Sequence, residues 1–181
     1  MGNFQSALLG NIQTALTGAG RVRGLALHKL LEEVLSGELG DDIPALQARG
    51  SELLDQLGAT LPGRPDAEEM ARAVKRGLEL PEIAAVRGRL RPEWSISRSW
   101  MRDDGVEEVV VGVADAVAVE DDDSVSLVVD WKSDVAPDKA TVAGYRGQLG
   151  DYLRATRTAK GMLVFLTTGV ISTVDGERTA P

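Results

Sequence analysis

The sequence contains no cysteine and only one histidine, His28. The absence of cysteine excludes disulfides, thiolate zinc sites and iron–sulfur clusters, so any bound metal must use oxygen and imidazole ligands. Catalysis by a serine–histidine–aspartate triad would depend on His28 alone. There is also no Gly-x-x-x-x-Gly-Lys-Ser/Thr loop, which excludes ATP binding through that motif.

Long hydrophobic runs are missing as well. No apolar segment approaches the roughly 20 residues that a membrane-spanning helix needs. Residues 1–16 lack the basic segment and continuous apolar core of a signal peptide. We therefore expect a cytoplasmic protein without a membrane partner. The 181 residues, 43% of them hydrophobic, are typical of one globular domain over residues 1–181.

Positive charge is scarce. The chain has 20 Lys and Arg residues against 28 Asp and Glu residues, a net charge of −8. This balance argues against strong, indiscriminate binding to nucleic acid, which needs many contacts from Lys and Arg to phosphates. The charge is uneven, because residues 131–160 hold six Lys or Arg residues and three Asp residues. A local basic surface on an acidic protein therefore remains open.

Residues 1–91 are expected to be mainly helical. Apolar residues recur at helical spacing in four segments, at about residues 4–16, 27–35, 43–57 and 66–80. Asp66 and Glu69 have the spacing of a capping box at the start of the last segment.

From Trp94 onward the apolar residues alternate as in β-strands. We predict strands at about residues 94–100, 109–119 and 125–133, with an acidic hairpin turn between the last two. A helix at about 137–158, a strand at 162–167 and a short strand after Gly169 follow. This order favours an α/β fold, with a mixed central sheet flanked by helices, in which residues 92–175 hold the sheet and a crossover helix.

Two acidic residues interrupt the apolar strands. Asp115 shares its predicted strand face with five valines, while Asp130 and Lys132 lie two residues apart and hence on one face. Because burying an unpaired carboxylate is costly, we interpret these groups as a metal site suited to phosphodiester hydrolysis. Mg²⁺ prefers such oxygen ligands, and an added imidazole makes Mn²⁺ an alternative.

These residues also have ordinary structural interpretations. Asp115 and Asp130 could lie in solvent at strand ends, Lys132 could be only an ion-pair partner, and His28 could be a surface residue. The tryptophans are expected in the core, and residues 121–123 in a solvated turn.

The helix at residues 137–158 has two further features. Tyr152 belongs to an apolar stripe with Val142, Tyr145 and Leu149, so it could simply pack on the sheet. Three glycines, Gly144, Gly147 and Gly150, disfavour a helix and suggest that its backbone comes close to either the sheet or a phosphate.

Four motifs together resemble those of PD-(D/E)XK nucleases of the RecB-like branch. They are Arg23-Gly24-Leu25-Ala26-Leu27-His28, Gly112-x-x-Asp115, Asp130-Trp131-Lys132 and Gln148-x-x-x-Tyr152. The likeness extends over about residues 21–174 and is greatest to the nuclease domains of bacterial recombination helicase subunits such as RecB and AddA. It implies a restriction-endonuclease-like αβββαβ core, here preceded by an N-terminal helical region.

The resemblance implies a role for each matching residue. His28, Asp115 and Asp130 would bind the metal, with the main-chain carbonyl of Trp131 as a further ligand. Lys132 would position the attacking water.

The resemblance also places Gln148 and Tyr152 along the site, where they would contact the DNA strand. Arg146, from the basic part of the chain, is a further candidate for DNA contact. Glu93 is a weaker match to an acidic residue that precedes the core sheet.

Our leading hypothesis is a Mg²⁺-dependent deoxyribonuclease that acts on single-stranded or helicase-unwound DNA in recombination or repair. The helicase domains of the relatives are missing, so the chain is either a stand-alone relative or an excised domain, and a helicase is an expected partner. Two alternatives remain open: a non-catalytic DNA-binding or scaffolding module of the same fold, and an endonuclease that cuts duplex DNA.

Overall fold

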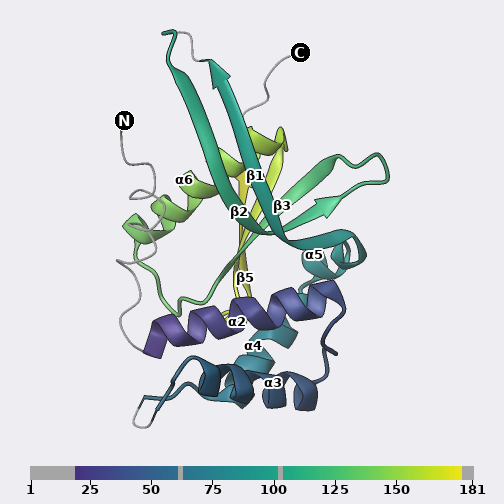
Figure 1. Ribbon diagram of the computed structural model, residues 1–181, viewed down its shortest axis with the longest axis vertical. Coiled ribbons are helices and arrows are strands. Elements are labelled where there is room, and N and C mark those ends of the chain that lie inside the picture. Colours follow the sequence, from purple (N-terminus) through teal and green to yellow (C-terminus); the bar gives the residue numbers. More distant parts are fainter. Residues whose placement is uncertain (1–18, 61–62, 102–103, 177–181) are drawn as a thin grey trace.

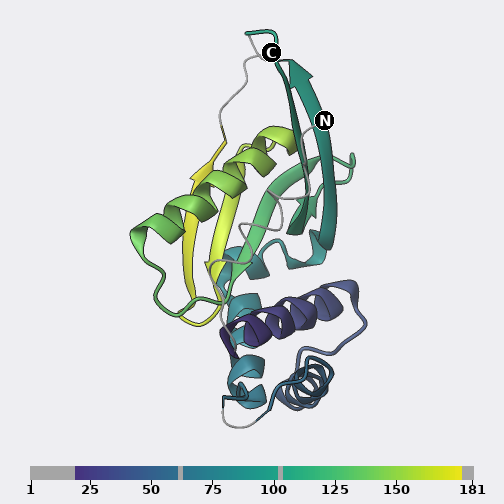
Figure 2. The ribbon, with the colours of Figure 1, turned by 60° about the vertical axis from the view of Figure 1, so that its left-hand side comes forward.

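The computed structural model describes residues 19–60, 63–101 and 104–176 of the protein. The helix predicted at residues 4–16 lies outside the described residues. A five-stranded sheet with the strand order β1-β2-β3-β4-β5 forms the centre (Figures 1 and 2). Within the described ranges, no helix is long and apolar enough to cross a lipid bilayer.

The elements follow the predicted order. The helices α2 (Ala19–Ser36), α3 (Ile43–Gln56), α4 (Ala67–Glu79) and α5 (Pro81–Ala84) come first, followed by the 3₁₀ turn η1 (Arg87–Arg89). The remaining elements are β1 (Leu90–Met101), β2 (Glu107–Val119), β3 (Val125–Lys132), α6 (Lys139–Thr156), β4 (Lys160–Phe165) and β5 (Val170–Asp175). Among the described residues, only α5 and η1 are additions to the predicted plan, and both are too short to show helical periodicity in the sequence.

The sheet is mixed, as predicted. Strands β3 and β4 are parallel and are connected by α6, whereas the other neighbouring strands pair antiparallel. The turn between β2 and β3 is closed by a hydrogen bond from Glu120 N to Ser124 O at 2.9 Å. Residues 121–123 are exposed there, which confirms the predicted solvated turn. The α/β fold with a mixed sheet is therefore confirmed.

Aspartate side chains begin three of the helices. Asp42 accepts a hydrogen bond from Ala45 N in α3, and Asp138 accepts one from Thr141 N in α6. Asp66 caps α4 by accepting from Glu68 N. The predicted capping box is incomplete, however, because the carboxylate of Glu69 is bound by a guanidinium of α2.

Helices cover both faces of the sheet (Figures 1 and 2). Helices α2 to α5 pack on one face, where Leu27 and Leu30 contribute to the same apolar cluster as Val129 and Trp131 of β3. Helix α6 packs on the other face, where Leu149 lies in a second cluster. Trp131 is 1% exposed and thus a core residue, as predicted for the tryptophans. Trp94 is only partly buried against the second cluster and Trp100 belongs to neither cluster, so the prediction is confirmed for Trp131 alone. Cover on both faces explains why five consecutive residues of β3, Leu127 to Trp131, are buried.

The predicted face of five valines on β2 is wrong. Val109, Val111 and Val113 are 53%, 56% and 46% exposed, because the β1–β2 hairpin extends beyond the helices that cover the rest of the sheet (Figure 1). The alternation also breaks at Asp115. Ala114 packs in the cluster with α6, whereas Ala116, two residues later, packs in the cluster with α2.

Candidate active site

The candidate residues meet where β2 and β3 separate. The hydrogen-bonded register of these strands ends at Ala116 and Val129, so Asp115 and Asp130 are no longer paired across the ladder. The main-chain N–H of Trp131 instead donates to Oδ2 of Asp115 at 2.7 Å. This bond satisfies a buried N–H that lacks a strand partner, and it holds the Asp115 carboxylate beside β3.

His28 and Asp115 form the first charged pair of the site. Helix α2 brings Nδ1 of His28 to 3.3 Å from Oδ1 of Asp115. Burial alone would lower the pKa of His28, but the Asp115 carboxylate outweighs burial and raises it. Burial would raise the pKa of Asp115, but His28, Lys132 and the Trp131 N–H lower it. An ionised carboxylate beside the imidazole is therefore the favoured state.

Asp130 and Lys132 form the second pair. Their side chains are 8% and 12% exposed, and Nζ of Lys132 lies 2.7 Å from Oδ2 of Asp130. The contact is an ion pair without the angles of a hydrogen bond, so this buried oxygen has no hydrogen-bond donor among the described residues. Burial, followed by repulsion from Asp115, raises the pKa of Asp130 to about 7. The described residues thus stabilise the negative charge of the Asp130 carboxylate only in part.

A divalent cation fits this set of groups. Carboxylate oxygens and an imidazole are suitable ligands for Mg²⁺ or Mn²⁺, and Oδ2 of Asp130 is a buried oxygen that a cation would satisfy. Across the described residues, no three His, Asp or Glu side chains are grouped closely enough to hold an ion as they stand. Binding would require the side chains of His28, Asp115 and Asp130 to exchange their present ion pairs for the cation.

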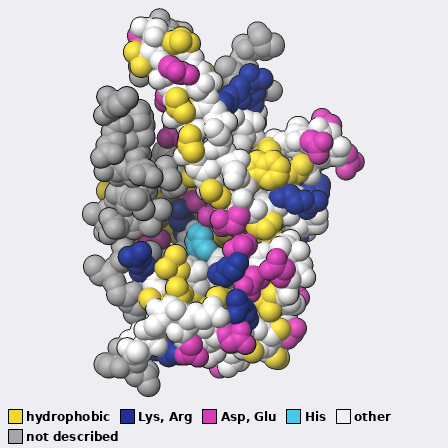
Figure 3. All heavy atoms as spheres, viewed as in Figure 1, with side chains coloured by type: hydrophobic (Ala, Val, Ile, Leu, Met, Phe, Trp, Pro, Cys, Tyr) yellow, Lys and Arg dark blue, Asp and Glu magenta, His cyan; other side chains and the backbone are white. Residues whose placement is uncertain are grey.

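The surface above these pairs is acidic. His28 is visible as the single histidine, with acidic side chains around it (Figure 3), and its side chain is 33% exposed. Glu93 of β1 is one of the nearby acidic residues, and burial, followed by Asp115, raises its pKa. Its backbone has φ of 49°, an unfavourable value for a residue with a side chain. The strand is therefore distorted where it passes the site.

Tyr145 of α6 is a site residue that the sequence did not identify. Its ring centroid lies 4.1 Å from Nζ of Lys132, and its hydroxyl donates to Oδ2 of Asp134 at 2.9 Å. The ring therefore holds the ammonium group by a cation–π contact. The only sequence signal is that Tyr145 shares a helical face with Gln148 and Tyr152.

Gln148 and Tyr152 lie together on α6. Nε2 of Gln148 donates to the Tyr152 hydroxyl at 3.3 Å. Tyr152 is 9% exposed, and a Cβ atom at Gly112 would come within 2.8 Å of its hydroxyl oxygen. The glycine of the Gly112-x-x-Asp115 motif therefore makes room for Tyr152. Tyr152 thus packs in the interior, while Gln148 is exposed, and contact of either residue with DNA stays a prediction.

Arg146 of α6 lies away from the candidate site residues on β2 and β3. Its Nη1 donates to Oγ of Ser172 on β5 at 2.8 Å, two strands away from β3. A contact between Arg146 and DNA stays a prediction.

The three glycines of α6 have open space beside them. A Cβ atom added at Gly144, Gly147 or Gly150 would have no other atom within 4 Å. The adjacent residues and the backbone of the helix itself are left out of this comparison. The expectation that the helix approaches the sheet through these glycines is therefore wrong. Approach to a phosphate stays a prediction.

Arg23 connects α2 to the strand ends that carry the site. Its Nη1 donates to the carbonyl of Ser133 at 2.8 Å, and its Nη2 donates to Oγ1 of Thr167 at 3.1 Å. The same guanidinium binds both carboxylate oxygens of Glu69 in α4, at 2.7 and 3.0 Å. The bidentate contact with Glu69 is partly buried, and it orients the guanidinium that holds the helix of His28 next to the residue that follows Lys132.

Comparison with known proteins identifies the family of the chain. A family model described as the PD-(D/E)XK nuclease superfamily matches residues 6–170. A solved structure named "Crystal structure of SSO0001" is 21% identical, with coverage of 84% of this chain and 77% of that chain and a TM-score of 0.40. No curated protein matches the chain. The family match spans most of the sequence, and on that basis the chain belongs to the PD-(D/E)XK nuclease superfamily.

Proposed function

We propose that this protein is a metal-dependent deoxyribonuclease of the RecB-like branch, which hydrolyses phosphodiester bonds in single-stranded or helicase-unwound DNA during recombination or repair. The observation that carries the proposal is the buried pair of Asp130 and Lys132 beside the pair of His28 and Asp115. Metal-dependent hydrolysis of a phosphodiester can use carboxylates that hold the cation and a cationic side chain next to the phosphate.

His28, Asp115 and Asp130 would hold the cation, with the main-chain carbonyl of Trp131 as a further ligand. When bound, Mg²⁺ supplies a water of lowered pKa and neutralises charge on the phosphate. The carboxyl of Asp130 is suited to this task because the protein alone leaves it poorly compensated.

Lys132 acts on the attacking water. Its ammonium group would bind the water and offset negative charge that develops on the phosphate. The ring of Tyr145 contacts this ammonium group and would hold it in position when Asp130 binds the cation. Hydrolysis adds the elements of water across the bond between phosphorus and the 3′-oxygen, leaving a 3′-hydroxyl and a 5′-phosphate.

The charge of the chain supports a substrate that is delivered to the site. A net charge of −8 leaves little sequence-independent attraction to DNA at physiological salt. A helicase domain or subunit that feeds an unwound strand would overcome this weakness by raising the local DNA concentration.

A panel of substrates tests the proposal. The purified chain is incubated with linear and circular DNA, each single- and double-stranded, in the presence of Mg²⁺, Mn²⁺ or chelator. We expect metal-dependent cleavage of the linear single strand. Binding without cleavage in every condition would favour a scaffolding module, and cutting of closed duplex circles would favour a duplex endonuclease.

A further inference from the structure

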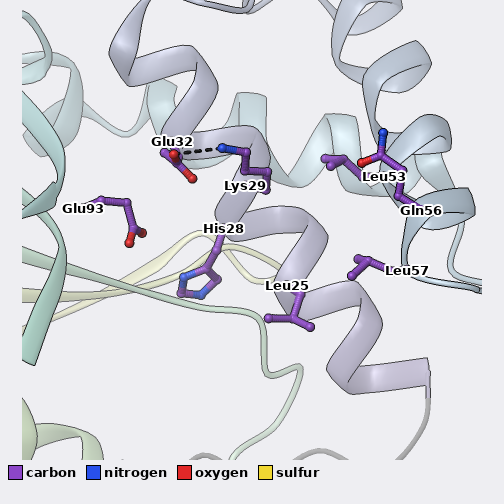
Figure 4. A pocket seen from close by; sticks show the side chains of 8 residues that line it. All are labelled: Leu25, His28, Lys29, Glu32, Leu53, Gln56, Leu57 and Glu93. Carbon is purple, nitrogen blue, oxygen red and sulfur yellow. Dashed lines mark hydrogen bonds and ion pairs between the residues drawn. The ribbon is translucent and has the colours of Figure 1, made fainter.

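A cavity of about 320 Å³ opens beside His28, between α2, α3 and β1 (Figure 4). Leu25 of α2, Leu53 of α3 and Leu57 at the end of α3 line one side of it, and Glu93 of β1 lies across from them. His28 belongs both to this cavity and to the pair with Asp115. The cavity is therefore continuous with the candidate active site.

The apolar wall is unusual for this protein. Leu25 and Leu57 are 49% and 38% exposed, and they are the only leucines in the described part of the chain with such exposure. Both line the same cavity. An exposed apolar wall beside a reactive centre is typical of a surface that contacts a ligand.

Five of the eight residues that line the cavity are polar or charged, and two of them, Gln56 and Glu93, are available to a ligand. The amide of Gln56 has no hydrogen-bond partner among the residues that the structure describes. The strained backbone of Glu93, with φ of 49°, places a carboxylate on the opposite wall. An amide and a carboxylate can read hydrogen-bonding groups on the edge of a ligand whose flat faces contact leucine.

The charge of the lining selects a neutral ligand. Lys29 also lines the cavity, but its Nζ is bound by Glu32 at 2.9 Å and lies 4.0 Å from Glu33. Glu93 then adds a carboxylate that no Lys or Arg of the described chain pairs with. Away from His28, the carboxylates of Glu32 and Glu93 would repel a phosphate, whereas an uncharged aromatic ring would not be repelled.

We propose that this cavity binds one unstacked nucleobase of the substrate strand while the neighbouring phosphate lies at His28, Asp115 and Asp130. The proposal rests on the nuclease function and names the substrate subsite of that centre. Its volume is at the lower end of the range for small-ligand sites, about 300–1,000 Å³. An unpaired strand can supply such a base at little cost, whereas a duplex must first unpair one.

Binding of oligonucleotides in chelator and low salt tests the subsite without cleavage. A single abasic residue is moved through a fluorescent single strand, and the Kd is measured at each position. We expect one position at which loss of the base weakens binding to the wild type by at least about fivefold, as for a stacked base. Leu25→Ala and Leu57→Ala should bind the intact and the abasic strands equally.

Val170→Ala is the matched control, because Val170 is 54% exposed on β5 and does not line the cavity. This variant should discriminate as the wild type does. Equal discrimination by the leucine variants, or no position of weakened binding in the wild type, overturns the subsite. If the same preparations still cut unmodified DNA with Mg²⁺, only the proposed base subsite is wrong. If the wild type neither binds the oligonucleotides nor cuts DNA, both the base subsite and the nuclease function are wrong.

Discussion

Nη1 of Arg23 donates a hydrogen bond of 2.8 Å to the carbonyl oxygen of Ser133, the residue that follows Lys132. This bond joins the helix of His28 to the strand of Asp130 and Lys132. The guanidinium of Arg23 therefore helps to set the spacing between the two charged pairs of the site, together with the packing of α2 on β3.

Replacement of Arg23 by Ala should weaken both the fold and the site. Loss of charge-assisted hydrogen bonds in a largely buried position costs about 1.5–3 kcal/mol, measurable as a lower free energy of unfolding in urea. Calorimetry should also show a lower affinity for Mn²⁺. Arg72→Ala is the control, because the pair of Arg72 with Glu68 is exposed and such pairs contribute little. Equal effects of the two substitutions would contradict a positioning role for Arg23.

Replacement of Asp130 by Asn should stabilise the metal-free protein at pH 8. The raised pKa, about 7, means that the folded protein disfavours this charge. Because each unit of pKa shift corresponds to about 1.4 kcal/mol, we expect a gain of at least about 1 kcal/mol in chelator.

The raised pKa of Asp130 also makes the stability of the fold depend on pH. Asp130 retains its proton in the folded state where the unfolded chain, with a pKa of about 3.9, has lost it. Protonated Asp130 therefore contributes its full stabilisation below a pH of about 3.9, and this stabilisation is lost as the pH rises to about 7. The advantage of Asn should grow over this window, as thermal melts would show. Mg²⁺ should raise the melting temperature of the wild type but not of Asp130→Asn, and an equal rise in both would exclude Asp130 as a ligand.

Gly144→Ala and Gly147→Ala should each increase the stability of α6. Both positions are exposed and open, so the added methyl group meets nothing, and alanine favours a helix by about 0.5–1 kcal/mol over glycine. If a DNA phosphate approaches the helix here, both variants should bind single-stranded DNA more weakly in a fluorescence titration. Unchanged DNA affinity in the stabilised variants would remove these glycines from the DNA-binding surface.

Glu93→Gly should be more stable than Glu93→Ala. Both substitutions remove the carboxylate, but only glycine adopts a positive φ without strain, which costs of the order of 1 kcal/mol at such sites. Chemical denaturation of the two variants isolates this backbone contribution. Equal stability would show that the φ of 49° carries no strain.

Much of the fold could be predicted because local patterns and the fold agree. The leucine spacing of α2, the acidic turn after β2 and the capping residue Asp66 each depend only on neighbouring residues. The proximity of Asp130 and Lys132 follows in the same way from the two-residue period of a strand.

Other features depend on how elements pack, which local patterns do not encode. The exposure of Val111 reflects how far the helices reach along β2, and the contact of Tyr145 with Lys132 reflects the path of α6 across the sheet. Arg146 lies near Tyr145 in sequence but faces β5. The bond of Arg23 to Ser133 joins residues 110 positions apart, so no spacing rule could identify it.

Single-turnover cleavage by the wild type and Lys132→Ala is the most direct test of the active site. A 5′-labelled single-stranded oligonucleotide is mixed with excess protein and Mg²⁺, and the product is followed over time. The wild type should cut the strand, chelator should stop the reaction, and Lys132→Ala should be at least about a hundredfold slower while melting as a folded protein. Cleavage at the wild-type rate by Lys132→Ala, or cleavage that persists in chelator, would contradict the proposed mechanism.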